Sequence, residues 1–271
     1  MNTTLITGAT GKTGRRVAER LTAMGRATKL GSRSRDVRFD WDDESTWAPA
    51  LDGCTSAYIT FAPDLAFPGA ADTIERFAKT AVEAGTTRLV LLSGRGEEAA
   101  QLAEQKVIES GADWTVVRCA FFAQNFSESF WVESVQAGEL ALPGNTAEPM
   151  VDLEDVADVV VAALTDDRHI GRVYECTGPR LLTFDEAMAE IGAATGRAMS
   201  FRDQSPEEFA QDLVAGGLPE ADAHGLAYLF VEILDGHNSY LTGGVQAALG
   251  REPRDFSDYV RRTADTGVWN G

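Results

Sequence analysis

The 271-residue chain has few cysteines and few histidines, and these shortages limit its chemistry. Cys54, Cys119 and Cys176 are far apart and form no C-x-x-C pair. This pattern predicts free thiols in a reducing cytoplasm, not a disulfide framework. The three histidines are isolated and lack the spacing of metal ligands, so we expect no metal site.

Positive charge and long apolar runs are also scarce. The chain has 24 Lys and Arg against 42 Asp and Glu, which gives a formal net charge of −18. Because such a surface repels phosphate backbones, nucleic acid is not an expected partner. No run of 18 apolar residues occurs, and no basic segment followed by an apolar core opens the chain. We therefore expect no membrane span and a cytoplasmic location.

The opening segment LITGATGKTGRR allows two interpretations, because it resembles both a nucleoside-triphosphate loop and a dinucleotide loop. The triphosphate loop G-x-x-x-x-G-K-[ST] would need a glycine where Ile6 stands. The dinucleotide turn needs a short buried strand, then glycines, then a helix whose N-terminus faces the pyrophosphate. Residues 3–7 are β-branched and apolar, and Val17, Leu21 and Met24 follow at helical spacing. The order strand, glycines, helix favours a dinucleotide.

Strands and helices alternate through the first two thirds of the chain. Such alternation is typical of right-handed βαβ units and predicts an α/β, Rossmann-type, doubly wound parallel sheet. The expected strands cover residues 3–7, 27–30, 37–39, 57–60, 88–92 and 114–117, and the expected helices cover about 46–51, 70–84 and 97–110.

From about residue 120 the pattern changes. The segment CAFFAQNFSESFWVES, residues 119–134, predicts one aromatic helix, and a helix over 154–164 and a strand within GRVYECTG follow. Thr183 with Glu186 and Ser205 with Glu208 predict two capping boxes at helix N-termini. We therefore expect an NADP-binding domain over 1–150, completed by part of 151–180, and a smaller, mostly helical substrate-pocket region over 181–271.

The residues after the second strand bear on the choice between NADP and NAD. A protein that prefers NAD usually carries Asp or Glu there, which binds the ribose 2′-hydroxyl. This chain has Ser32, Arg33 and Arg35 instead, and its next acidic residue, Asp36, comes late. A guanidinium binds a 2′-phosphate well, so the sequence predicts NADP(H) over NAD(H). The alternative is that the two arginines only solvate a turn.

Several motifs together resemble the NmrA-like branch of atypical short-chain dehydrogenases/reductases. They are GATGKTGRRV, FDWDD, RLVLLSG, SGADWTVVR, FFAQNF and VDLEDVADV. Within this branch the chain resembles the ergot-alkaloid reductase group, of the agroclavine dehydrogenase and festuclavine synthase type, and its composition is typical of a bacterial member. The late segments YECTGPRLLTFDEA and LGREPRDFSDYVRRTADTGVW fit that group, so the resemblance covers nearly the whole chain.

The resemblance implies a set of cofactor-binding residues: a pyrophosphate loop, a segment that frames the adenine, the ends of the fourth and fifth strands, and a lysine that holds the nicotinamide ribose. Together with the residues near the ribose 2′ position they are Gly8, Thr10, Gly11, Lys12, Thr13, Gly14, Ser32, Arg33, Arg35, Asp40, Trp41, Thr60, Phe61, Ala62, Ser93 and Lys106.

One position departs from the typical short-chain pattern. Typical members carry a proton-donating tyrosine four residues before the lysine, but LAEQK puts Leu102 there, before Lys106. Reduction of a ketone leaves an oxyanion, which needs a general acid to protonate it. A leucine side chain cannot donate a proton. Reduction of an iminium ion gives a neutral amine without a proton donor. The leucine and the ergot-group resemblance therefore both favour an imine or iminium substrate, although a protein without activity would also lack the tyrosine.

The aromatic segment supplies the candidate substrate pocket. Asn125 is the polar residue of this segment, and we expect it to orient the substrate or the carboxamide of the cofactor. Asn125 and Lys106 are the two candidate catalytic residues. The alternative is that these aromatic side chains belong to the core. The candidate pocket residues are Phe121, Phe122, Phe126 and Trp131.

Two classes of function follow from these patterns. The first is an NAD(P)H-dependent reductase of a small or medium apolar substrate, iminium or imine first, with quinone and enone reduction as variants. In it the cofactor carries the chemistry and the protein supplies orientation. The second is a sensor that binds NADP(H) and a protein partner without turnover. Turnover of a small molecule distinguishes the two.

Overall fold

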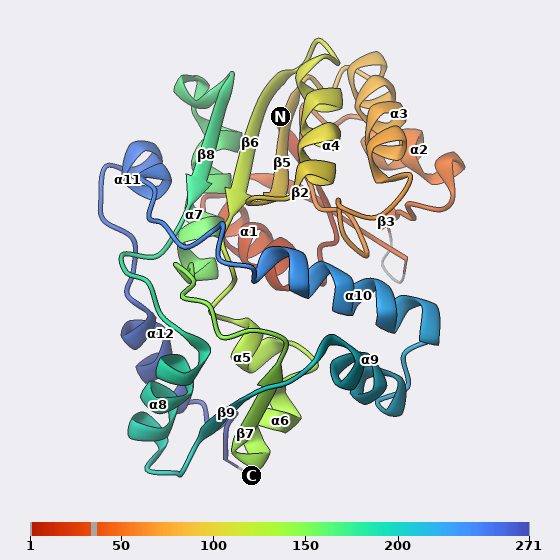
Figure 1. Ribbon diagram of the computed structural model, residues 1–271. Helices are drawn as coiled ribbons and strands as arrows, with labels where there is room; N and C mark the ends of the chain where they lie inside the picture. The colour runs from red at the N-terminus through yellow and green to blue at the C-terminus, as the bar shows by residue number, and fades with distance from the viewer. Residues whose placement is uncertain (1, 34–36, 271) are drawn as a thin grey trace. The chain divides into compact units, whose positions relative to one another are not determined.

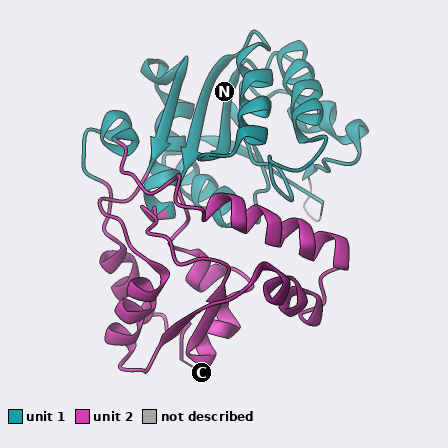
Figure 2. Ribbon diagram, viewed as in Figure 1, with its two compact units in different colours: residues 1–119, 153–176, 243–252 teal, residues 120–152, 177–242, 253–271 magenta. Residues whose placement is uncertain are grey.

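The computed structural model describes residues 2–33 and 37–270, and the chain divides into two compact units (Figures 1 and 2). Unit 1 comprises Met1–Cys119, Leu153–Cys176 and Gly243–Glu252, and unit 2 comprises Ala120–Asp152, Thr177–Thr242 and Pro253–Gly271. These boundaries differ from the predicted ones, because residues 120–152 belong to unit 2 and residues 243–252 return to unit 1.

The described part of unit 1 contains a seven-stranded parallel sheet in the order β3-β2-β1-β4-β5-β6-β8. The strand order reverses between the neighbours β1 and β4, and this switch point is where open α/β sheets bind ligands at the carboxyl ends of their strands. The predicted Rossmann-type sheet is confirmed. Its strands are β1 Thr3–Thr7, β2 Ala27–Ser32, β3 Val37–Arg38, β4 Ser56–Ile59, β5 Arg88–Gly94, β6 Asp113–Cys119 and β8 Arg172–Cys176.

Helices cover both faces of this sheet (Figure 1). On one face α2, α3 and α4 pack against alternate strand residues such as Leu5, Leu89 and Leu91. On the other face α1 packs against α7, and α11 contacts α7 and β8. The helices are α1 Lys12–Ala23, α2 Trp47–Leu51, α3 Ala70–Glu83, α4 Glu98–Ile108, α7 Leu153–Thr165 and α11 Gly244–Leu249, with short 3-10 turns at Glu44–Thr46 and Asp167–His169.

Unit 2 has its own aromatic core and a small parallel sheet that the sequence did not predict. In the described residues β7 Glu139–Leu142 pairs with β9 Ser200–Asp203. Both predicted capping boxes are confirmed, at the N-termini of α8 and α9. The helices of unit 2 are α5 Asn125–Glu128, α6 Val132–Ala137, α8 Phe184–Thr195, α9 Pro206–Ala215, α10 Glu220–Ile233 and α12 Phe256–Ala264.

The prediction of one aromatic helix over 119–134 is wrong. Phe121 and Ala123 exchange backbone hydrogen bonds with Val151, which holds the first part of the segment extended. The rest splits into α5 and α6 at Ser129, whose backbone is extended. The Ser129 hydroxyl donates to Asn125 O at 2.6 Å and accepts from the Trp131 N–H at 3.1 Å. Such side-chain bonds to the backbone compete with the helix.

Candidate functional site

The turn between β1 and α1 has no room for a side chain at Gly8 or Gly14. Gly11 N–H donates to Gly8 O at 2.8 Å, which closes a tight turn. Gly8 has φ +60°, and a Cβ there would lie 2.3 Å from Thr60 Oγ1. A Cβ on Gly14 would lie 2.3 Å from Gly8 O, an atom of the backbone. These glycines let the backbone approach a ligand closely.

Helix α1 starts directly after this turn. Its N-cap, Gly11, is extended and makes no side-chain cap, and no acidic residue occupies the first turn. The N–H groups of a helix's first turn lack partners within the helix, and its dipole favours an anion there. Thr13 and Gly14 are buried, whereas Thr10 and Gly11 are exposed. A glycine turn with little side-chain bulk, followed by a helix without a side-chain cap, is the arrangement that binds the pyrophosphate of a dinucleotide.

The residues predicted to frame the adenine lie next to the residues that follow β4. Trp41 Nε1–H donates to Thr60 O at 3.1 Å, and the Trp41 ring lies 5.0 Å from the Phe61 ring. Thr60 is fixed in turn, because its hydroxyl donates to Thr7 O at 3.0 Å. The exposed Ala62 follows these residues, and the Asp40 carboxylate accepts from Asp42 N–H. The segments after β3 and β4 therefore form one aromatic surface at the carboxyl edge.

Two of the residues predicted to select NADP lie at the carboxyl end of β2. Ser32 is the last residue of this strand, and Arg33 follows it with an exposed side chain. Arg35 and Asp36 lie outside the described residues.

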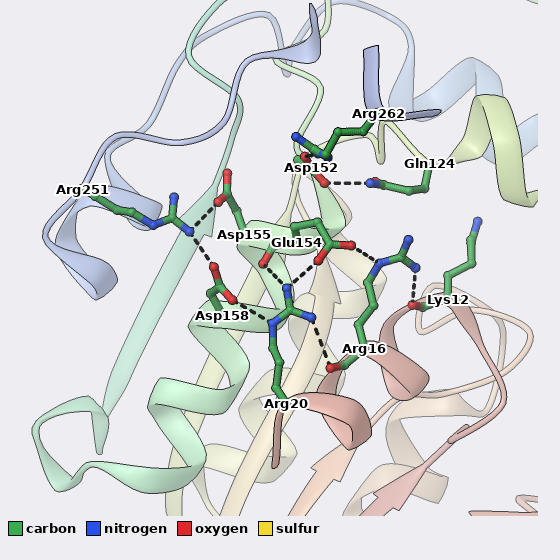
Figure 3. A network of polar contacts seen from close by, with 10 residues as sticks. All are labelled: Lys12, Arg16, Arg20, Gln124, Asp152, Glu154, Asp155, Asp158, Arg251 and Arg262. Atoms are coloured by element: carbon green, nitrogen blue, oxygen red, sulfur yellow. Dashed lines mark hydrogen bonds and ion pairs between the residues drawn. The ribbon is translucent and has the colours of Figure 1, made fainter. Parts of the chain in front are cut away.

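A cluster of ion pairs joins α1 to α7 (Figure 3). Arg16 Nε lies 2.7 Å from Glu154 Oε1, and Arg20 bridges Glu154 at 2.5 Å and Asp158 at 2.7 Å. Arg16 also donates to Lys12 O at 2.8 Å. Arg251, from α11's C-terminal flank, pairs with Asp158 at 2.7 Å. We call these residues the α1–α7 cluster; it fixes the helix that follows the glycine turn.

A second cluster lies at the carboxyl ends of β5, β6 and β8. Ser93, Arg118 and Glu175 are register partners on neighbouring strands, each one residue from its strand's end. Ser93 Oγ donates to Glu104 Oε1 at 2.6 Å, from β5 to α4. Arg118 donates to both oxygens of Glu104, at 2.8 and 2.5 Å, and to Glu175 at 3.1 Å. The hydrogen bond to Glu104 raises the pKa of the Arg118 guanidinium.

The side chains of Leu102 and Lys106, which the resemblance placed at the catalytic position, do not point towards Ser93. Leu102 is 62% exposed, and Lys106 Nζ lies 3.2 Å from Glu75 Oε2 on α3. Both stand two residues from Glu104, and residues two apart on a helix point in different directions. The structure therefore brings Glu104, and neither Leu102 nor Lys106, to Ser93. The α4 helix turns Lys106 towards α3, and its place at the nicotinamide ribose stays a prediction.

Two carboxyl groups meet in the loops that follow β4 and β5. Asp64 is hydrogen-bonded to Glu97, and burial raises the pKa of Asp64. A Cβ on Gly94, at the end of β5, would lie 2.1 Å from Glu97 Oε1. Gly94 therefore makes space for the Glu97 carboxyl group at the edge of the sheet.

The predicted pocket aromatics pack together within unit 2. Phe126 and Trp131 are buried in its core, and Phe121, partly buried, stacks on Trp131 at 5.4 Å. Phe122 forms a backbone bridge with Val151, and Asn125, partly buried, begins α5. The alternative interpretation, that aromatics of this segment form core, is correct for Phe126 and Trp131.

Comparison with known proteins agrees with this geometry. A family described as NAD(P)H-binding matches residues 8–167. An uncharacterised oxidoreductase of Bacillus subtilis is 32% identical over 99% of this chain and 96% of that protein. Agroclavine dehydrogenase of Claviceps fusiformis is 29% identical over 98% of each chain. The chain belongs to the NAD(P)H-binding family.

This family member is an oxidoreductase, and the predicted resemblance to agroclavine dehydrogenase is confirmed. Its fold is similar to that of the triphenylmethane reductase of Citrobacter sp. complexed with NADP(H), with a TM-score of 0.77 and 18% identity over 97% of this chain and 100% of the other. The family and the fold therefore support a nicotinamide cofactor.

Sequence reasoning missed Glu104 in this oxidoreductase, although a signal was present. Ala100, Ala103 and Val107 form the buried face of α4, and Glu104 falls on the same face. A charged residue within an apolar stripe indicates a buried partner.

Other features of the NAD(P)H-binding chain bear on its chemistry. Cys54, Cys119 and Cys176 are free, as predicted, and all three are buried. Across residues 2–33 and 37–270, no group of three or more His, Cys, Asp or Glu is arranged to hold a metal ion. Within the same residues, no helix has the length and apolarity to cross a membrane.

Proposed function

We propose that this oxidoreductase is an NADPH-dependent reductase of small or medium apolar imines and iminium ions. One observation carries the proposal: the α4 side chain that faces the carboxyl end of β5 is Glu104, a carboxylate held by Arg118. A carboxylate in this pairing accepts hydrogen bonds and has no proton to give. A substrate that needs no proton on its product fits this site better than a ketone does.

The chain's own residues would hold and orient the cofactor. Gly8, Gly11 and Gly14 leave room for the pyrophosphate at the start of α1, and Trp41 and Phe61 offer an aromatic surface for the adenine. Lys12, Thr10 and Thr13 complete the turn, and Asp40 and Ala62 flank the aromatic surface. When bound, the nicotinamide supplies a hydride to an electron-poor carbon of the substrate.

Charge at the edge of the sheet supports a cationic substrate. The carboxyl groups of Asp64 and Glu97 lie in the loops that follow β4 and β5, near the strand ends where an open sheet meets a ligand. Because two carboxyl groups share a hydrogen bond only when one of them keeps its proton, the pair carries one negative charge. A carboxylate there would stabilise an iminium ion by Coulomb attraction. Within unit 2, Phe121, which is partly buried and stacked on Trp131, and Asn125 remain the residues that the sequence predicts for the substrate pocket.

Arg33 is the described residue that we propose to select NADPH. Its guanidinium follows β2, where a ribose 2′-phosphate would add negative charge. Arg33→Ala should weaken NADPH binding about tenfold or more and leave NADH nearly unchanged, measured by fluorescence titration. Arg172→Ala, which removes an exposed arginine at the start of β8, is the control. Equal losses of NADPH and NADH in Arg33→Ala would refute the selection.

The substrate class is tested by following NADPH oxidation against cyclic iminium salts, quinones, enones and ketones of similar size, with NADH in parallel. Turnover of iminium salts but not of ketones is the expected result. Turnover of quinones or enones alone would replace the proposed substrate class. Tight NADPH binding without turnover of any class would favour a sensor, and a protein partner would then be sought.

The free, buried cysteines fit the reducing cytoplasm that we infer as the location of this enzyme.

A further inference from the structure

The Ser93 hydroxyl group has one proton, and the structure shows where that proton goes. Ser93 Oγ lies 2.6 Å from Glu104 Oε1, and Glu104 is 1% exposed. Arg118 reaches both oxygens of the same carboxylate. Because an ionised carboxylate only accepts and a guanidinium only donates, Ser93 must be the donor in its bond to Glu104. The proton of Ser93 is thereby committed to Glu104.

What remains on Ser93 Oγ are its lone pairs. A hydroxyl whose proton is engaged offers only acceptor capacity to anything else that approaches it. Ser93 is the penultimate residue of β5 and is 4% exposed, so only a group placed directly against this strand end can reach it. The carboxyl ends of the strands are where the ligands of open α/β sheets bind.

We propose that Glu104 is a positioning residue that makes Ser93 Oγ an obligate acceptor, and that this oxygen receives an N–H group of the bound ligand. The inference rests on the proposed function only in naming the ligand's two sources of N–H. One is the carboxamide of the nicotinamide, and the other is a protonated imine substrate. Both share the same chemistry, a polarised N–H donor, and an uncharged ketone offers none.

A single isosteric substitution reverses this polarity. In Glu104→Gln the new side chain has one oxygen and one NH₂ group, and Arg118 presents only donors. Arg118 donates to the Oε2 position from both Nε and Nη2, and to the Oε1 position from Nε alone. The amide oxygen is therefore favoured at the Oε2 position, which leaves the NH₂ group at the Oε1 position to donate to Ser93 Oγ. The Ser93 proton is then released towards the ligand, so Ser93 becomes a donor there. A carbonyl oxygen then becomes the favoured partner.

The cofactor arm of the test needs no turnover. Calorimetric titration compares NADP⁺ with its acetylpyridine analogue, in which a methyl ketone replaces the carboxamide. If the N–H comes from the cofactor, the unmodified protein prefers NADP⁺ by about tenfold, the value of one hydrogen bond of about 1.4 kcal/mol. Ser93→Ala should abolish this preference. Glu104→Gln should also abolish the preference, because this variant should bind the acetylpyridine analogue more tightly than the unmodified protein does. Structural damage would weaken binding and would not produce this gain.

Glu175→Gln is the matched control, because Glu175 pairs with Arg118 in the same cluster whereas Ser93 donates its proton to Glu104. It should leave the preference for NADP⁺ unchanged. If Glu104→Gln does not fold, Ser93→Ala still decides, since a preference that survives loss of the hydroxyl overturns the cofactor source.

The substrate arm compares a protonated cyclic imine with its N-methyl iminium analogue, which has no N–H. If the substrate supplies the N–H, the unmodified protein has a lower KM for the protonated imine than for the N-methyl analogue. In Ser93→Ala the two KM values should become equal. In this case none of the proteins should prefer NADP⁺ over its acetylpyridine analogue. No dependence on Ser93 in either arm overturns the inference. A preference for NADP⁺ that follows Ser93 and Glu104, with no imine turned over, would uphold the inference and refute the proposed function.

Discussion

Two arginine–carboxylate clusters of unit 1 contain the same residue types and lie in different surroundings. The α1–α7 cluster joins two helices through partly exposed side chains, such as Arg20 and Glu154. The cluster at the carboxyl ends of β5, β6 and β8 instead surrounds Glu104, which is buried and accepts a hydrogen bond from Ser93 near the end of β5. The comparison teaches that burial and the neighbouring polar group, not the residue types, separate a cluster that fixes a helix from one that shapes a site.

The largest expected difference between the clusters is in stability. Glu104→Ala removes the buried partner of Ser93 and Arg118, although Arg118, which is 22% exposed, keeps Glu175, so the loss should be about 3 kcal/mol. Glu154→Ala removes a partly exposed carboxylate and should cost about 1 kcal/mol. Urea unfolding of both variants measures the two losses. Equal losses would mean that burial does not distinguish the clusters.

A smaller effect appears with pH in the α1–α7 cluster. Burial by itself would raise the pKa of Glu154, but hydrogen bonds from Arg20 and Arg16 outweigh it and lower the pKa to about 2. Because the pKa of Glu154 is lower in the folded than in the unfolded protein, its ionisation stabilises the fold at pH values above the unfolded pKa, near 4.5. This contribution is lost as the pH falls towards 2. The free energy of unfolding should therefore differ between the unmodified protein and Glu154→Gln at pH 6.

That difference should be about 1 kcal/mol at most, because solvent screens a partly exposed pair, and should shrink steadily below pH 4.5. Using the difference between two proteins cancels the titration of other carboxyl groups. A difference that stays constant from pH 6 to pH 2.5 would show that the arginines do not lower this pKa.

The smallest expected effect concerns Lys106, which belongs to neither cluster. Its partner is Glu75, so Lys106→Ala should change NADPH affinity and turnover by less than about twofold. Lys79→Ala removes the other lysine that pairs with Glu75 and is the matched control. A joint fall of affinity and turnover in Lys106→Ala alone would instead place this lysine at the nicotinamide ribose.

The glycine turn and the central sheet could be predicted because their signals are local. The turn needs glycine at Gly8 for its positive φ and at Gly14 for the close backbone, and apolar strands alternate with periodic helices around it. The capping boxes of α8 and α9 are equally local, since each spans four residues.

The unpredicted parts depend on contacts between distant residues. The strands β7 and β9 pair Glu139 with Ser200, and no periodicity within either segment names its partner. Phe121 and Ala123 are held extended by Val151, which overrides the helical spacing of the aromatic residues. Glu104 was missed because resemblance directed attention to Leu102 and Lys106, which point away from the strand end.

The central claim is that the site reduces its substrate without donating a proton, and isotope effects test it most directly. Initial rates are measured on an N,N-dialkyl cyclic iminium salt, first with NADPH deuterated at the transferred position and then in D₂O. The account predicts a clear primary isotope effect from the cofactor and no solvent isotope effect. A large solvent isotope effect on this substrate, or turnover of ketones with equal efficiency, would contradict it.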